Sequence, residues 1–404
     1  MSRRLATSTL TLVGSQAIYN GGLAVEFALI VNWFGDTAQG SYSIALGLAS
    51  LFEVGVHWGS QHLVNREAAA RFDTLKARLP ALFAASLLTI GCVAVAITGV
   101  YGWPMAVIAT AALMRAGAML VGAICIGRGH LLAPVIARIL SPLLALGVMV
   151  FWVRHDPTLA GLALATVAAT VGYAGPMWLA ARHLGLHGPA GPSRWLAGWR
   201  QLAGDVWPYL VLFFFGQLLF RSDSVLLKVL SDETVVAHYM RAFKWIEGLF
   251  FLPHVVASVA IPALVAAGRS GDPRAQGRTL LQIALVLVCG LSLVAVALRL
   301  VGPAILHMVL GEAVADASTL FGTLVWIVPI HGLGIYLAAA LVTRRQERTL
   351  LVVVIVASLS SLAAKAIGFS LFGTGAFVWG LYFGLLLHAV GCAWCLWRQP
   401  GSPA

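Results

Sequence analysis

Long apolar segments recur from one end of the sequence to the other, and each is long enough to cross a lipid bilayer. A membrane-spanning helix needs about 20 predominantly apolar residues. Segments of this length suit helices alone, because the bilayer core holds no water to pair with exposed backbone groups. We therefore predict an all-α polytopic membrane protein with twelve spans, at about residues 8–34, 41–65, 79–100, 104–127, 131–153, 158–181, 207–230, 237–265, 279–301, 319–343, 349–371 and 376–397.

The charged residues support this interpretation and orient the chain. Asp, Glu, Lys and Arg make up 10% of the 404 residues, whereas soluble proteins average about 25%. The net charge of +11 does not indicate nucleic-acid binding, because the basic residues lie in short loops between apolar segments. Seventeen of them fall on one set of loops and termini, against Arg154 alone on the other set. The positive-inside rule then places both termini in the cytoplasm.

The sequence contains no signature of an enzyme or of a metal site. It has no Walker motif, no H-E-x-x-H and no G-x-S-x-G. All five cysteines lie inside predicted spans, and the C-x-x-C of Cys392 and Cys395 has no second pair. We interpret these cysteines as small apolar residues. The expectation is a chain that is not an enzyme and binds neither a metal nor a cofactor.

One segment divides the chain almost in half. Residues 182–206 begin with Gly and Pro and then place tryptophan and leucine side chains at helical spacing. We expect a flexible cytoplasmic linker followed by a short amphipathic helix on the membrane surface. It would separate an N-terminal six-helix lobe at 1–181 from a C-terminal six-helix lobe at 207–404.

The two halves are related by an internal repeat at an offset of 197 residues. The matches include Glu26 with Asp223, Tyr42 with Tyr239, Ala45 with Ala242, Cys92 with Cys289, and His57 with His254. Several of these are polar residues, which are rare within membrane spans. Parallel repeats related by an axis along the membrane normal are an architecture of transporters, with the substrate site between the repeats. We therefore predict two parallel lobes around a central cavity.

Polar residues gather on one face of four predicted spans. On spans 1, 2, 7 and 8 these faces contain Asn20 and Glu26, Glu53 and His57, Gln217 and Arg221, and Arg241, Lys244, Glu247 and His254. Asp223 points about 200° away from Arg221 on a helical projection. Each charge facing lipid would cost about 2.5–3.5 kcal/mol on insertion scales. The grouping therefore favours a shared polar interior, although snorkelling of Arg241 and pairing between helices for Arg221 and Glu26 remain open.

The balance of charges indicates a class of substrate. Cations outnumber carboxylates in the interior set, and a basic cavity favours a phosphate or pyrophosphate group. The candidate ligands of such a head group are Arg221, Arg241, Lys244, Arg115 and Lys365. The candidate coupling or structural carboxylates are Glu26, Glu53, Asp223 and Glu247, with His57, His254, Asn20 and Gln217 as polar lining.

Segments of both halves resemble the polysaccharide-type transporters of the multidrug/oligosaccharidyl-lipid/polysaccharide exporter superfamily. Residues 207–264 show this pattern in Pro208, Asp223, Tyr239, Ala242 and Pro262, and residues 31–69 show it in Gly35, Gly40 and Tyr42. The segments ILHMVLGEAVADASTL (305–320) and FGTGAFVWG (372–380) are also similar to the family. The resemblance implies twelve or fourteen helices in two lobes and translocation of a lipid-linked glycan by alternating access. It also implies a pyrophosphate site, which maps onto Arg221, Arg241 and Lys244.

The function expected from this resemblance is a flippase for an undecaprenyl-pyrophosphate-linked oligosaccharide in the bacterial cytoplasmic membrane, for O-antigen, capsule or exopolysaccharide assembly. Its partners would be membrane lipid, the lipid-linked substrate, and a polysaccharide polymerase with its chain-length machinery. The alternative is an ion-coupled drug or metabolite antiporter of the same superfamily, which the interior carboxylates keep open. An integral-membrane enzyme is disfavoured, because the longest external loop, 302–318, has only Glu312 and Asp316 as ionisable groups.

Overall fold

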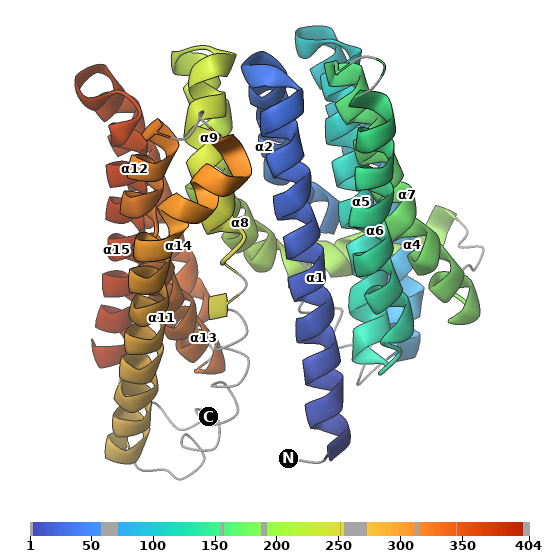
Figure 1. Cartoon of the computed structure of the whole chain (residues 1–404). Helices are drawn as coiled ribbons and strands as arrows, with labels where there is room; N and C mark the ends of the chain where they lie inside the picture. The colour runs from blue at the N-terminus through green and yellow to red at the C-terminus, as the bar shows by residue number, and fades with distance from the viewer. Residues whose placement is uncertain are drawn as a thin grey trace. The chain divides into compact units, whose positions relative to one another are not determined.

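The structure is a computed structural model of the whole chain, and in the segments it describes every regular element is a helix (Figure 1). The described residues are 3–57, 72–153, 155, 157–186, 192–250, 252–253, 273–311, 315–344 and 346–398. This confirms the predicted all-α fold.

Each described helix overlaps one of the predicted spans. In the first half of the chain they are α1 (Arg3–Trp33), α2 (Gly35–His57), α4 (Phe72–Tyr101), α5 (Trp103–Gly127), α6 (Leu132–Val153) and α7 (Leu159–His183). They continue with α8 (Pro192–Leu230), α9 (Glu233–Glu247), α11 (Pro273–Leu310), α12 (Ala315–Leu324), α13 (Ile327–Thr343), α14 (Glu347–Phe372) and α15 (Gly375–Arg398).

Within the described residues, nine segments are long and apolar enough to cross a membrane. Helices α1, α2 and α9 are not among them, and these are the helices that carry most of the polar residues predicted on spans 1, 2 and 8. The number and apolar character of the segments identify a multi-pass membrane protein. Large apolar side chains such as Leu293 and Met308 are exposed along α11, as expected for a surface that faces lipid tails.

Two predicted spans are interrupted. The tenth span is divided into α12 and α13 by a turn at residues 325–326. In the eighth span, α9 ends at Glu247 and a turn follows at residues 248–250. Most of the remainder of that predicted span, including His254 and Pro262, lies outside the described residues.

The chain forms two compact units, Met1–Gln217 and Leu218–Ala404, and the boundary lies within α8. The helix expected within 182–206 begins at Pro192 and continues without interruption into the seventh predicted span. Proline suits that first position, because the first helical residue needs no backbone donor.

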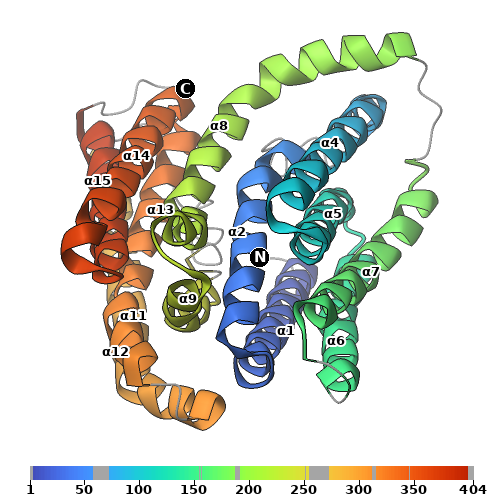
Figure 2. The same ribbon diagram turned by 90° about the horizontal axis from the view of Figure 1, so that it is seen from above.

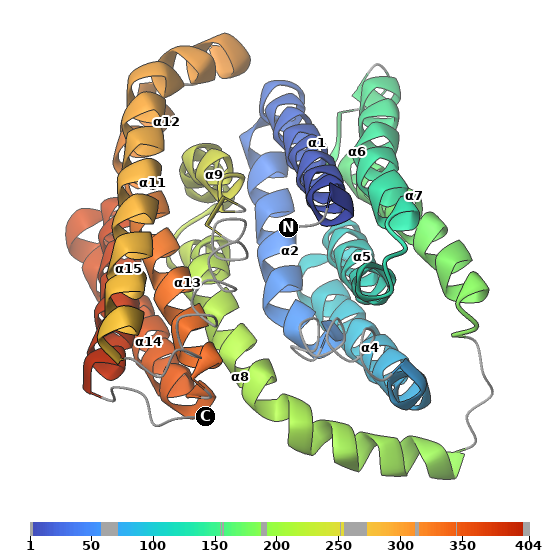
Figure 3. The same cartoon turned by 90° about the horizontal axis from the view of Figure 1, so that it is seen from below.

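Each unit is a helical bundle. In the N-terminal unit α5 contacts α2, α4 and α7, and Figure 2 shows it surrounded by these helices. Its core includes an edge-to-face pair of Tyr19 and Tyr173, with ring centroids 6.1 Å apart. In the C-terminal unit α15 packs against α13 and α14, and α11 packs against α12 and α13, as seen in Figure 3.

Candidate functional site

The C-terminal unit contains a fully enclosed ion pair between α8 and α14. The Lys365 Nζ lies 2.6 Å from the Asp223 Oδ1, and the two side chains are 0% and 1% exposed. The same ammonium donates to the backbone oxygen of Leu219 at 3.1 Å. The hydroxyl of Tyr239 on α9 donates to the other carboxylate oxygen, Asp223 Oδ2, at 2.6 Å. Both oxygens of Asp223 are therefore satisfied without solvent.

The lysine reaches this position because α15 presents no side chain there. A Cβ built on Gly380 would lie 2.5 Å from the Lys365 Cγ. The hydroxyl of Ser361, one turn before Lys365 on α14, donates to the backbone oxygen of Gly380 at 2.7 Å. Small residues allow membrane helices to approach closely, and here the approach encloses the apolar stem of the lysine.

The N-terminal unit holds an equivalent acid and tyrosine pair. The Tyr42 hydroxyl donates to the Glu26 Oε1 at 3.0 Å, and both residues are buried. Glu26 and Tyr42 are 16 residues apart, as are Asp223 and Tyr239. The residues aligned at an offset of 197 therefore form the same acid–tyrosine hydrogen bond in both halves.

The cation near the Glu26–Tyr42 pair is Arg115, which lies on a third helix, α5. The guanidinium of Arg115, on α5, interacts electrostatically with Glu26, Glu53 and Tyr42. Arg115 and Glu53 are half-buried, and Glu26 is 4% exposed. The structure therefore brings together three of the ionisable residues that the sequence analysis placed on separate spans.

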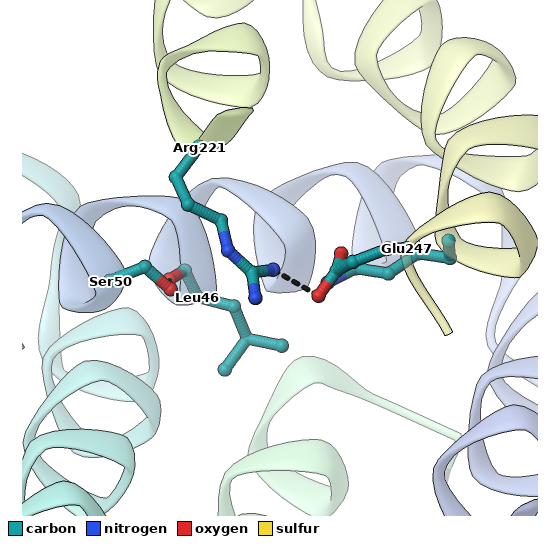
Figure 4. A network of polar contacts seen from close by, with 5 residues as sticks. Leu46, Ser50, Arg221 and Glu247 are labelled. Carbon is teal, nitrogen blue, oxygen red and sulfur yellow. Dashed lines mark hydrogen bonds and ion pairs between the residues drawn. The ribbon is translucent and has the colours of Figure 1, made fainter. Parts of the chain in front are cut away.

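A second cluster of charges lies where α9 ends, and it is partly accessible. The Arg221 guanidinium of α8 donates to the Glu247 Oε1 (Figure 4). The Lys244 Nζ donates to the Glu247 Oε2 at 2.9 Å. The side chains of Arg221, Lys244 and Glu247 are 30%, 17% and 18% exposed. As the helical projection predicted, Arg221 and Asp223 face different partners. We call Arg221, Lys244 and Glu247 the charge triad.

The remaining predicted site residues are distributed over both units. Arg241 on α9 is buried at 4% exposure, and Gln217 on α8 is half-buried. Asn20 accepts a hydrogen bond from Gln16 at 3.0 Å. His57 is the last residue of α2, but its side chain lies outside the described part of the structure, as does His254.

Three kinds of interaction were not assigned from the sequence. The tyrosine partners of the buried carboxylates were aligned by the repeat, but the alignment alone gave no role to them. Arg138 on α6 donates to the Leu12 backbone oxygen at 3.1 Å and to the Ser15 hydroxyl at 3.0 Å, which joins α6 to α1. At the end of α8, Lys228 pairs with Glu233, and its hydrogen bond lowers the pKa of that carboxyl group.

Cations outnumber carboxylates among the predicted site residues on α8, α9 and α14. Among the predicted site residues, these three helices carry four cations, Arg221, Arg241, Lys244 and Lys365, and two carboxylates, Asp223 and Glu247. Asp223 pairs with Lys365, and Glu247 pairs with both Arg221 and Lys244. Among the described residues, no group of His, Cys, Asp and Glu could hold a metal ion.

Solved structures of membrane transporters share this all-helical fold. Similar solved structures include a mutant of the Vibrio cholerae MATE transporter VcmN, with a TM-score of 0.65 and 13% identity over 98% of this chain and 99% of that one. A multidrug resistance MATE family transporter of the MOP superfamily, in an inward-facing conformation, gives 0.64 and 15% over 98% and 97%. The lipid II flippase MurJ, in an inward closed conformation, gives 0.70 and 10% over 98% and 88%.

The TM-scores show a shared all-helical fold, as the resemblance of both halves implied. No protein-family model and no curated protein matches the sequence.

Proposed function

We propose that this chain is a flippase that moves a lipid-linked oligosaccharide, held by its undecaprenyl pyrophosphate, across the bacterial cytoplasmic membrane by alternating access. The product would serve O-antigen, capsule or exopolysaccharide assembly, next to a polysaccharide polymerase and its chain-length machinery. The distribution of basic loops supports a position in the inner membrane with both termini in the cytoplasm. Among proteins of the same fold, MurJ is a lipid II flippase.

The observation that carries this proposal is the charge triad. Placing Arg221 within the candidate membrane span of α8 is costly, and ionisable residues there usually mark a substrate or ion pathway. The triad contains two cations and one carboxylate, and Arg241 lies on α9 with Lys244 and Glu247. A planar guanidinium can hold a phosphate through two parallel hydrogen bonds, and an ammonium adds a point charge.

Accessibility separates the basic residues by role. Arg221 and Lys244 are partly exposed, so a ligand can reach them. Lys365 is fully enclosed and bound to Asp223. We therefore propose Arg221 and Lys244 as the principal head-group ligands, with Arg241 of the same unit supporting the local potential. Arg115, in the N-terminal unit, remains a predicted head-group ligand. For Lys365 we propose a structural role in place of direct contact with the substrate.

A second candidate function is an ion-coupled drug or metabolite antiporter. The observation that favours it is the pair of buried carboxylates, Glu26 and Asp223, each bonded to a tyrosine. MATE transporters share the fold. An antiporter would export cationic compounds in exchange for protons or sodium, and Glu26→Gln would abolish that exchange.

The decisive experiment measures flipping in proteoliposomes loaded with a fluorescent pyrophosphate-linked oligosaccharide, with an external reagent that quenches molecules reaching the outer leaflet. Arg221→Ala should lose flipping, because the head group loses its guanidinium. Lys228→Ala is the matched control: it also removes one cation of α8 and one ion pair, but at the helix end. Normal flipping by a folded, inserted Arg221→Ala protein would refute the phosphate-holding role. Ion-driven export of a cationic dye, without glycan flipping, would favour the antiporter.

A further inference from the structure

Glu247 occupies an unusual position for a carboxylate. It is the last residue of α9, and the Gly248 N–H already caps the helix by donating to the Lys244 backbone oxygen at 3.1 Å. The C-terminus of a helix carries a partial negative charge, which disfavours an anion and favours a cation. Lys244 therefore suits this place and Glu247 does not. The carboxylate is held there by Arg221 and Lys244, which engage one oxygen each.

The geometry points to Glu247 as an internal counter-anion that a pyrophosphate group displaces from Arg221 and Lys244. This inference rests on the proposed function and extends it to the binding step. A pyrophosphate offers more negative charge and more acceptor oxygens than one carboxylate. It would meet a site whose two cations are already positioned and partly exposed, with side chains 30% and 17% accessible.

The exchange also has a mechanical consequence. Arg221 belongs to α8, whereas Lys244 and Glu247 belong to α9, so the Arg221–Glu247 bond ties the two helices together. When the head group takes Arg221, Glu247 is left at the negative end of α9 without that cation. In the described part of the adjoining turn, the Phe250 N–H donates to the Glu247 backbone oxygen at 3.0 Å, and the Phe250 ring packs against Phe220 of α8, with ring centroids 5.1 Å apart. Head-group binding would therefore remove the ion pair between α8 and the end of α9, leave the contact between Phe220 and Phe250 in place, and loosen this turn.

The first test measures the affinity of inorganic pyrophosphate for the full chain in nanodiscs by calorimetry. If Glu247 competes with the ligand, Glu247→Gln removes a charged hydrogen-bonding competitor and should tighten binding by about tenfold. Glu233→Gln is the matched control, because Glu233 also pairs with a lysine of the same unit but lies outside the triad. Unchanged or weaker binding by a folded Glu247→Gln protein would overturn the inference.

The second test uses the unaltered protein, so that it does not depend on the folding of a variant. Hydrogen–deuterium exchange is followed at the amides of residues 248–250 with and without pyrophosphate. Displacement of Glu247 predicts faster exchange in this turn at saturating pyrophosphate. Equal or slower exchange there while pyrophosphate binds, or no binding at all, would overturn the proposal.

Two comparisons separate this inference from the proposed function and identify the source of the ligand. A polyprenyl pyrophosphate embedded in the nanodisc should give the same exchange response as inorganic pyrophosphate. A response to the inorganic ion alone would exclude the lipid as the source. Glycan flipping without tighter binding by Glu247→Gln would overturn the counter-anion but keep the flippase. Tighter binding without flipping would keep the counter-anion and overturn the flippase.

Discussion

Replacing Lys365 with methionine tests whether the enclosed ion pair holds the C-terminal unit together. The change keeps most of the apolar stem but leaves the Asp223 carboxylate buried, with Tyr239 as its remaining side-chain donor. Removing one partner of a buried ion pair destabilises a protein by about 3–5 kcal/mol. For a unit of about this size, each kcal/mol lowers the unfolding midpoint by about 2–4 °C, so we expect a decrease of about 6–20 °C.

Two buried thiols allow the effect to be assigned to one unit. Cys392 on α15 and Cys125 on α5 are both 0% exposed, and they belong to the C-terminal and N-terminal units respectively. Labelling of each cysteine by a thiol reagent, resolved by mass spectrometry during a thermal ramp, reports the opening of its own unit. Lys365→Met should lower the labelling midpoint of Cys392 far more than that of Cys125.

The control for this prediction removes both charges at once. Asp223→Asn combined with Lys365→Met leaves no uncompensated charge, and such neutral replacements are often close to harmless. The double variant should therefore recover most of the Cys392 midpoint. A further comparison, Lys228→Met, breaks a partly exposed pair and should cost less than about 1 kcal/mol. If the single variant unfolds like the unaltered protein, or the double variant is as unstable as the single one, the reasoning is wrong.

Two further predictions use the same labelling. Gly380→Ala places a Cβ 2.5 Å from the Lys365 Cγ and should cost about 1–3 kcal/mol through overpacking. The control Gly290→Ala, whose Cβ would meet no atom within 4 Å, should leave the labelling midpoints unchanged. Equal effects of the two changes would contradict the close approach of α15 to α14. Tyr42→Phe and Tyr239→Phe each remove a hydrogen bond to a buried carboxylate, worth about 1.5–3 kcal/mol, so the first should lower the midpoint of the N-terminal thiol and the second that of the C-terminal thiol. If either variant lowered the midpoint of the thiol in the other unit, the two acid and tyrosine pairs would not be equivalent.

The helices could be predicted because the requirement for a bilayer span is local in sequence. Apolar length alone located α5 at 103–127 against an expected 104–127, and α6 at 132–153 against 131–153. The turns at 248–250 and 325–326 were not foreseen, because the residues within them remain apolar and give no break in hydropathy. A turn of this kind depends on contacts made by the flanking helices.

The candidate site was predictable only to the level of helix faces. The projection of α8 separated Arg221 from Asp223, and the structure gives them the different partners Glu247 and Lys365. Asp223 and Lys365 are 142 residues apart, so their pairing depends on how α14 packs against α8. No local sequence pattern shows which residues of α14 and α8 come into contact. Glu247 was identified as a carboxylate of the interior, but its place between two cations required the turn that ends α9.

The internal repeat offers a way to judge which charges the fold itself needs. At the offset of 197, the acid and tyrosine pair is present in both halves, and in each half the tyrosine bonds to the acid. The charge triad has no such counterpart, since Arg221, Lys244 and Glu247 correspond to Ala24, Gly47 and Ser50. The N-terminal unit, a helical bundle that contains the equivalent acid and tyrosine pair, therefore forms without the triad. The three equivalent positions of the first half all carry uncharged residues, which is expected if the three charges of the triad act together. This favours a role in binding an anion over a role in stabilising the bundle.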